Sequence, residues 1–154
     1  EPLLEVLGPE PFDDWNADIA AKKCRGKRSP IKTTLLDQRF VVGVGNIYAC
    51  EALHNAGIAP TKLASKLVTK AGKPTKSLVR LVDEVKIVLN KAIAAGGSTL
   101  NDFADVDGNL GYFSHHFTIY GREDQPCLKE GCAGTVERIV QSNRSTFWCP
   151  RCQK

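Results

Sequence analysis

Four of the six cysteines in this 154-residue chain lie close together in the last thirty residues. They form two pairs in the pattern C-x4-C-x16-C-x2-C, and they are Cys127, Cys132, Cys149 and Cys152. Two close pairs of thiolates, separated by an insert the length of a hairpin, are typical of a tetrahedral zinc site. The pattern therefore predicts one structural Zn²⁺ held by these four side chains.

Two disulfides or a redox-active C-x2-C motif are the alternatives to zinc. Disulfides are typical of secreted proteins, but the start of the chain has no basic segment followed by an apolar stretch, as a signal peptide would. Cys24 and Cys50 also remain outside the two pairs, and we interpret both as ordinary thiols. Cys50 lies in an apolar helical pattern and is expected to be buried. Zinc is the interpretation that we favour.

Basic residues are concentrated in two segments, although the net charge is only +4. Residues 19–36 carry no acid, and their bases are Lys22, Lys23, Arg25, Lys27, Arg28 and Lys32. The residues after Glu137 also carry no acid, and their bases are Arg138, Arg144, Arg151 and Lys154. Each base that neutralises a phosphate releases counterions, so two such segments indicate a polyanionic partner. Charge alone favours the alternative of a solvated basic face.

A glycine-containing turn, Gly43-Val44-Gly45-Asn46, precedes a helical pattern over residues 47–56. Glycine permits positive φ and close approach of the backbone, and Asn46 is a good helix N-cap. The free amides of a helix N-terminus form an anion site, to which the Asn46 side chain can add a donor. Three bases upstream would flank this surface: Lys27, Arg28 and Lys32. The alternative is that the two glycines only make a sharp turn.

Arg144 is expected at or near the tip of a hairpin turn over residues 141–145. A hairpin is narrow enough to enter a groove, and an arginine can clamp a phosphate with two hydrogen bonds. An ordinary exposed turn arginine is the alternative. Arg144 is therefore the second candidate for binding an anion.

Other polar clusters give weaker indications. His115 and His116 are adjacent in an extended segment and face opposite ways, so we interpret them, like His54, as structural or surface residues. An acidic loop contains Asp102, Asp105 and Asp107. It lacks the full EF-hand ligand pattern.

The elements that must position these residues are mainly helical. Helices are predicted over residues 12–24, 31–38, 47–56, 61–67 and 74–95. The first is expected to be capped by Asp13 or Asp14. The longest has apolar residues at i, i+3, i+4 and i+7 spacing. A long loop is predicted over residues 98–116.

The fold class is mainly α with a small β part. Strands are predicted over residues 117–120, 135–141 and 146–149. We expect a helical domain over residues 1–113 and a zinc ribbon over residues 114–154. A ribbon of roughly 40 residues has too little core to fold without its metal. No apolar stretch approaches the roughly 20 residues that cross a bilayer, so we expect no membrane partner.

Two segments resemble a known family. The run IKTTLLDQRFVVGVGNIYACEALHNAGIAP resembles the helix-two-turn-helix segment of the formamidopyrimidine-DNA glycosylase and endonuclease VIII (Fpg/Nei) family. The tail YGREDQPCLKEGCAGTVERIVQSNRSTFWCPRCQK resembles its C-terminal zinc finger. Residues 97–113 look like the lesion loop of the formamidopyrimidine branch, which closes over the everted base. The resemblance covers essentially the whole chain.

The resemblance implies the DNA-binding half of a bifunctional base-excision-repair enzyme, a DNA glycosylase and AP lyase. Such an enzyme flips oxidised purines, 8-oxoguanine and formamidopyrimidines, out of damaged double-stranded DNA. Asn46 and Lys32 match phosphate contacts of the family. Arg144 matches the finger arginine, to which a proton-donor role in δ-elimination has been assigned. The full set of predicted DNA-binding residues is Lys27, Arg28, Lys32, Gly45, Asn46 and Arg144.

Two departures from the family stand out. The first cysteine pair has the spacing x4 where many members have x2, and we expect this to change only the knuckle loop. The family's nucleophile is an N-terminal proline followed by a glutamate, with a lysine in an N-terminal β-sandwich. Glu1-Pro2 has the reverse order, and Pro2 has no free amine.

From this second departure, and from the absence of methionine, we expect a C-terminal part of a longer protein, without its N-terminal catalytic domain. Such a part would bind DNA without excising bases. A stand-alone zinc-containing nucleic-acid-binding module with no enzymatic parent is the alternative. A purely structural zinc scaffold would explain the cysteines but neither basic segment. We expect a monomer, cytoplasmic and nucleoid-associated as in bacteria.

Overall fold

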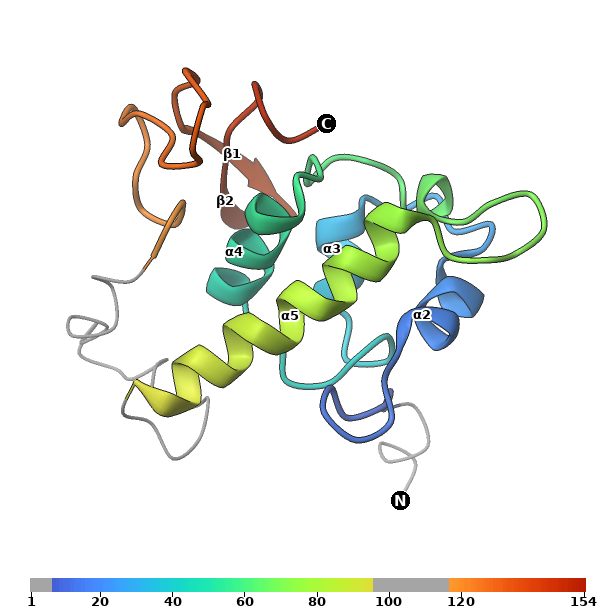
Figure 1. The fold of residues 1–154 in the computed structure, drawn as a ribbon. Helices are drawn as coiled ribbons and strands as arrows, with labels where there is room; N and C mark the ends of the chain where they lie inside the picture. The colour runs from blue at the N-terminus through green and yellow to red at the C-terminus, as the bar shows by residue number, and fades with distance from the viewer. Residues whose placement is uncertain (1–6, 96–116) are drawn as a thin grey trace.

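The computed structural model describes residues 7–95 and 117–154. Its longest element is helix α5 (Lys76–Ala94), which crosses the molecule diagonally in Figure 1. Thr75 caps this helix by accepting a hydrogen bond from the backbone N–H of Leu78 at 3.2 Å. The apolar stripe predicted from the sequence is buried from Leu78 to Ala92, whereas its last predicted member, Ile93, is exposed. The helix begins two residues later than predicted.

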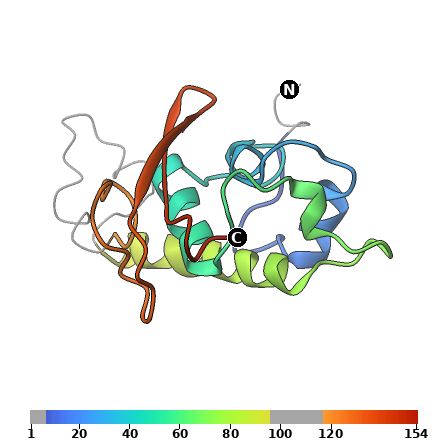
Figure 2. The same cartoon turned by 90° about the horizontal axis from the view of Figure 1, so that it is seen from above.

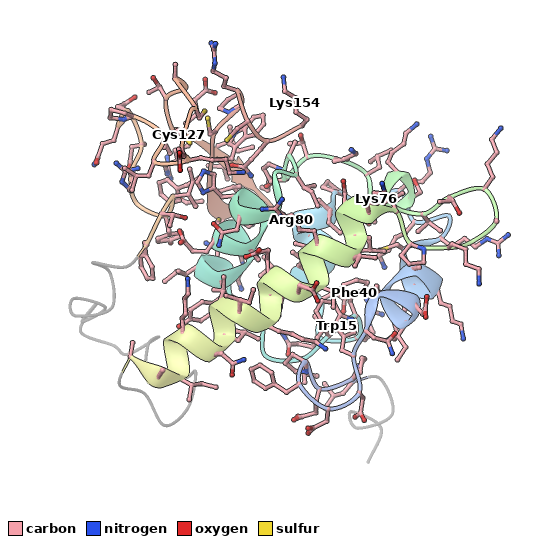
Figure 3. All side chains as sticks on the ribbon, viewed as in Figure 1. Trp15, Phe40, Lys76, Arg80, Cys127 and Lys154 are labelled. Atoms are coloured by element: carbon pink, nitrogen blue, oxygen red, sulfur yellow. The ribbon has the colours of Figure 1, made fainter. Side chains whose placement is uncertain are left out.

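Helix α2 (Ala17–Cys24) starts later than the sequence pattern predicts. The expectation that Asp13 or Asp14 caps it is wrong, because the cap is Asn16, whose Oδ1 accepts from the N–H of Ile19 at 2.9 Å. Trp15 precedes the helix and packs edge-on against Phe40, with 5.8 Å between the ring centroids (Figure 3). This contact joins the start of α2 to the segment that follows α3.

Helices α3 (Ile31–Leu36) and α4 (Asn46–Ala56) form the helix-two-turn-helix unit. Gly43 in the connection has φ +85°, the left-handed region that favours glycine. The N-cap of α4 is Gly45, so the prediction that Asn46 is the cap is wrong, and Asn46 is the first helical residue. Gly57 ends α4 with φ +74°, as predicted. A 3-10 helix, η1 (Ala64–Leu67), replaces the longer helix predicted over residues 61–67.

The helices share one hydrophobic core, in which α4 packs along α5 (Figures 1 and 2). Buried side chains from both helices form its centre, and they include Leu53, Leu78, Leu81, Val85 and Leu89. Among the described residues, no helix has both the length and the apolar character needed to cross a membrane.

Strands β1 (Glu137–Gln141) and β2 (Arg144–Trp148) form an antiparallel hairpin in which Gln141 pairs with Arg144. The two turn residues, Ser142 and Asn143, both have positive φ, which is the signature of a type I′ turn. Figure 2 shows the hairpin rising beside α4 on the side away from α5.

The prediction of a strand over residues 117–120 is wrong, because this segment forms a bend and a turn. A buried carboxylate, that of Glu51, accepts hydrogen bonds from the N–H groups of residues 118, 119 and 120. These are donors that a strand would give to a neighbouring strand. The backbone donors of the segment are thus bonded to α4 instead of to a neighbouring strand.

A second, smaller apolar cluster joins the ribbon to α4. Its buried members are Cys50, Ile119, Cys127, Val136, Phe147 and Cys149. Cys50 comes from α4 and is buried, as predicted. The ribbon therefore packs on the helical part through a shared core. The predicted lesion loop, residues 97–113, lies outside the described residues, as do Asp102, Asp105, Asp107, His115 and His116.

Candidate zinc centre and anion-binding surface

The four cysteines of the predicted zinc site converge in the structure. Their sulfur atoms all lie within 4.8 Å of one another. The Sγ atoms of Cys127 and Cys152 are 3.7 Å apart, and so are those of Cys132 and Cys149. A tetrahedron with zinc–sulfur bonds of about 2.3 Å places its sulfurs about 3.8 Å apart, so the cluster fits one zinc ion. All six cysteines are free thiols, which removes the disulfide alternative.

Local geometry prepares these thiols for a metal. The N–H of Gly134 lowers the pKa of the Cys132 thiol, which favours the thiolate. Burial raises the pKa of the Cys152 thiol, and so do its neighbouring thiols, so a cation is needed to hold four thiolates there. A Cβ at Gly134 would lie 2.6 Å from Cys149 Sγ, so only glycine fits beside the cluster. Four protein ligands leave no open coordination position, as in structural zinc sites.

The zinc ribbon is fixed to both ends of α4. At its C-terminal end, the buried Gln153 donates to the carbonyl of Ile58 at 2.9 Å and accepts from the N–H of Cys149 at 2.7 Å. At the same end, Lys129 donates to the carbonyl of His54 at 2.9 Å. Lys129 belongs to the longer first knuckle, so this loop contacts the last turn of α4.

At the N-terminal end of α4, the hairpin meets two predicted site residues. The Nδ2 of Asn46 donates to the carbonyl of Ser145 at 2.9 Å. The Nζ of Lys32 donates to Thr146 Oγ1 at 2.6 Å and to the same carbonyl at 3.4 Å. Lys32 is only 1% exposed, so the expectation that it flanks an open surface is corrected. Burial lowers its pKa, Cys50 nearby raises it, and Arg144 lowers it further.

Arg144 is exposed at the first position of β2, directly after the turn. It lines a cavity of about 280 Å³ between α3 and the hairpin tip, together with Lys32, Asp37, Gln141 and others. Gly45 is exposed and Asn46 is half-buried at the start of α4. The structure thus brings Lys32 and Asn46 together at one carbonyl, that of Ser145, which follows Arg144 in the chain.

A second cavity, of about 350 Å³, continues the basic surface. It is lined by Lys23, Lys27, Asp37, Arg39 and Phe40, so Asp37 lines both cavities. Lys27 was predicted, whereas Lys23 and Arg39 were not assigned to the site. Arg39 pairs with Asp37 at 3.0 Å, and this pairing lowers the pKa of Asp37. Arg28 is exposed and lines neither of these two cavities.

Two buried polar residues on α4 were missed as site residues. Glu51, 5% exposed, accepts from the N–H and hydroxyl of Thr118 at 2.7 and 3.0 Å and from two further N–H groups at 2.9 Å. His54, 2% exposed, has its pKa lowered to about 4 by burial and by the nearby Lys129 and Arg122. Their i, i+3 spacing on the buried face of α4 was the available signal.

Two family models match the chain. Residues 7–104 match the formamidopyrimidine-DNA glycosylase H2TH domain, and residues 124–154 match the zinc finger found in FPG and IleRS. The chain belongs to the formamidopyrimidine-DNA glycosylase H2TH family. Membership confirms the resemblance seen in the sequence, together with the helical domain followed by a zinc-finger hairpin.

Curated relatives of this H2TH chain carry the name formamidopyrimidine-DNA glycosylase. The protein from Bradyrhizobium sp. (strain ORS 278) is 52% identical over 155 residues, which cover 100% of this chain and 53% of the relative. The protein from Agrobacterium fabrum (strain C58 / ATCC 33970) is 51% identical over 154 residues, which cover 99% of this chain and 52% of the relative. The chain spans about half the length of the curated relatives it matches.

Solved structures with the same arrangement include the Lactococcus lactis formamidopyrimidine-DNA glycosylase, non-covalently bound to DNA containing an AP site. It has a TM-score of 0.80 and 31% identity, and the match covers 99% of this H2TH chain and 52% of that chain. MutM (Fpg) from Thermus thermophilus has a TM-score of 0.78 and 39% identity, over 99% and 55% of the two chains. MutM in complex with DNA containing carbocyclic 8-oxo-G has a TM-score of 0.79 and 32% identity, over 99% and 52%.

Proposed function

We propose that this chain is the DNA-binding half of a base-excision-repair DNA glycosylase and AP lyase that acts on oxidised purines. The observation that carries the proposal is the junction at Ser145, where Lys32 and Asn46 hold the hairpin tip and Arg144 extends from it. Relatives of the same fold bind DNA containing an AP site or an 8-oxoguanine analogue. The name of the curated relatives supports formamidopyrimidines as substrates, and the relative bound to DNA containing carbocyclic 8-oxo-G supports 8-oxoguanine.

In this proposal, the surface grips the phosphates of damaged duplex DNA. Arg144 donates two hydrogen bonds to a phosphate, while the amides at the start of α4, from Gly45 onward, face a second one. Lys32 stays buried beneath this surface. It fixes the hairpin through its hydrogen bonds to Ser145 and Thr146, and it adds positive charge near the phosphate. Lys27 and Arg28 extend the track along the strand, joined by Lys23 and Arg39. The zinc ion would stabilise the fold of the ribbon and would take no part in the reaction.

We further propose that these 154 residues bind DNA without excising a base. A proline nucleophile needs its secondary amine at the chain terminus, and none of these residues matches that of the family. Arg144 is the one candidate for a chemical step, as proton donor in δ-elimination after an N-terminal domain has formed the covalent intermediate. We place the intact protein, a monomer, in the bacterial cytoplasm near the nucleoid.

Two assays test the two parts of this proposal. Fluorescence anisotropy with a duplex containing an abasic-site analogue should show binding that exceeds that to an undamaged duplex. A nicking assay on an 8-oxoguanine duplex should show no cleavage. Lesion-specific cleavage by this chain alone would contradict the second part, and failure to bind any duplex would contradict the first. A preference for RNA over both duplexes would favour the stand-alone module.

A further inference from the structure

His54 lies between the zinc cluster and the interior of the helical part. Its Nε2 is 3.3 Å from the Sγ of Cys127, and its Nδ1 is 3.1 Å from the Oγ1 of Thr118. The side chain is almost completely buried, so water does not complete its hydrogen bonding. Both ring nitrogens are thus used inside the protein, and neither faces the proposed DNA surface.

The number of hydrogens on Cys127, His54 and Thr118 limits which hydrogen bonds these three side chains can form. A neutral imidazole carries one N–H, and a zinc-bound thiolate can only accept. A hydrogen bond to the Cys127 thiolate therefore requires the proton on Nε2, which leaves Nδ1 as an acceptor. The hydroxyl of Thr118 is the donor within reach of Nδ1.

Glu51 makes this arrangement possible. Its carboxylate lies 3.0 Å from the Thr118 hydroxyl, but it also accepts three backbone N–H groups, from residues 118, 119 and 120. The hydroxyl can therefore turn from Glu51 to His54 without leaving the carboxylate unsatisfied. The backbone bonds to Glu51 keep Thr118 beside the ring in either case.

We propose that His54 is a positioning residue of the zinc centre, which donates a hydrogen bond from Nε2 to the Cys127 thiolate while Thr118 fixes its tautomer. Partners of this kind orient the ligands of a metal, and their removal typically lowers metal affinity about 10- to 100-fold. His54 belongs to α4, the helix that also carries Asn46, so the metal and the proposed DNA contact lie at opposite ends of one rigid element.

The longer first knuckle reinforces this link. Lys129 lies inside the x4 spacing, between Cys127 and Cys132, and donates to the main-chain carbonyl of His54. The His54 carbonyl also accepts from the N–H of Gly57, the C-cap residue of α4, at 3.1 Å, so Lys129 is a second donor at this helix end. His54 is thus held by the same knuckle through both its ring and its backbone.

The test compares two substitutions in the full chain. His54→Phe keeps a planar ring but removes both nitrogens, whereas His54→Gln keeps an N–H donor near the Nε2 position. We expect His54→Phe to release zinc to an excess of a chromogenic chelator about 10- to 100-fold faster than the wild type. His54→Gln should stay within a few-fold of the wild type. Circular dichroism of the zinc-loaded proteins checks that each variant folds.

A spectroscopic measurement separates hydrogen bonding from packing. A hydrogen bond stabilises the sulfur lone pairs, so the thiolate-to-metal charge-transfer band of the Co²⁺-substituted protein should move to longer wavelength in His54→Phe. His54→Gln should keep the wild-type band. Lys129→Ala is the matched control, since it removes the knuckle bond to the His54 carbonyl and should leave the band unmoved.

Each outcome decides the proposal. An unmoved band in His54→Phe would overturn it, whether or not zinc release is faster. Zinc release that is equally fast in His54→Phe and His54→Gln, with the charge-transfer band at one position in both variants, would show that His54 acts only by packing. This result would also overturn the proposal. If His54→Phe does not fold, Thr118→Val carries the test, because it removes the group that fixes the tautomer. The expected result is then a band shifted in the same direction, and an unmoved band contradicts the proposal.

Discussion

The side-chain amide of Asn46 donates to the carbonyl of Ser145 at 2.9 Å, although the two residues lie 99 positions apart in the sequence. This bond joins the first turn of α4 to the residue that follows Arg144. Because Lys32 donates to the same carbonyl, the position of the arginine depends on α3 and α4 as much as on its own hairpin.

Arg144→Ala should weaken binding to duplex DNA and make it less sensitive to salt. The loss of one cationic phosphate contact reduces the slope of log K against log salt by about one unit. Anisotropy titrations at several salt concentrations measure the slope. Lys70→Ala, at an exposed position between η1 and α5, removes the same charge and should change the slope little. An unchanged slope in Arg144→Ala would show that the hairpin tip does not touch phosphate.

Lys32→Met should weaken DNA binding while changing the free energy of unfolding at pH 7 by no more than about 1 kcal/mol. A buried charge costs desolvation energy that a well-packed apolar chain avoids, so the lost hydrogen bonds are offset. Urea denaturation measures the stability, and anisotropy measures the binding. A large loss of stability with unchanged DNA binding would show that Lys32 stabilises the fold and does not contribute to DNA binding.

The same variant has a pH dependence of known sign. Burial lowers the pKa of Lys32 in the folded state below its ordinary value of 10.5. Between the lowered folded pKa and 10.5, the unfolded chain binds more protons than the folded one, so this group makes stability rise with pH. The wild type should therefore gain stability relative to Lys32→Met as the pH approaches 10.5. A difference that moves the other way would place Lys32 in a site that favours its charge.

Glu51→Gln should lower the free energy of unfolding by about 1–3 kcal/mol for each backbone N–H group that loses its acceptor. The amide group replaces an acceptor by a donor, which leaves one or more buried N–H groups of residues 118–120 without a partner. Thermal and urea denaturation of the zinc-loaded protein measure the loss. Glu84→Gln, on α5, serves as a control, since Glu84 is not among the described buried polar residues. Equal stability of Glu51→Gln and the wild type would contradict the anchoring role.

Gly134→Ala should weaken zinc binding, because the added methyl would lie 2.6 Å from the Sγ of Cys149 and 2.7 Å from the Cβ of Arg151. Gly45→Ala is the matched control: its nearest contact would be Tyr48 at 3.8 Å, and its φ of −88° suits any residue. Zinc affinity measured against a competing chelator should fall only in Gly134→Ala. DNA binding should fall in Gly45→Ala, because a methyl then covers amides at the start of α4. Zinc affinity that falls equally in both variants would contradict the steric argument.

Removal of zinc by a strong chelator should unfold the ribbon and spare the helices. The ribbon has little core apart from the cluster it shares with α4, so the metal supplies its folding energy. Emission from Trp148, at the end of β2, should shift while the helical circular dichroism is kept. If the emission does not shift on addition of the chelator, the ribbon folds without metal.

The features that the sequence predicts well are local ones. The spacing of the cysteines, the apolar period of α5 and the stop at Gly57 each depend on residues within a few turns, and the structure contains all three. Burial of Cys50 follows from the same periodic pattern. Local patterns of this kind survive folding because tertiary contacts reinforce them.

The features that the sequence does not predict depend on distant partners. Asn46 is a good N-cap in isolation, but its side chain bonds the hairpin, and Gly45 takes the cap position. Lys32 is buried because the hairpin covers it, and its Nζ donates to Ser145 and Thr146 there. Residues 117–120 have strand composition, but the carboxylate of Glu51 takes their N–H groups. No local pattern records that a partner about 70 to 110 positions away will supply these bonds.

The turn that carries Arg144 uses Ser142 and Asn143 at φ +49° and +65°, where a type I′ turn prefers asparagine followed by glycine. The tip is therefore less stable in this conformation than a two-residue turn can be, since a serine pays a steric penalty in the left-handed region. A turn that favours this conformation more strongly would lose less entropy when Arg144 binds a phosphate. The two turn residues can therefore change the affinity without any change to Arg144 itself, because they decide how firmly the hairpin holds the arginine in place.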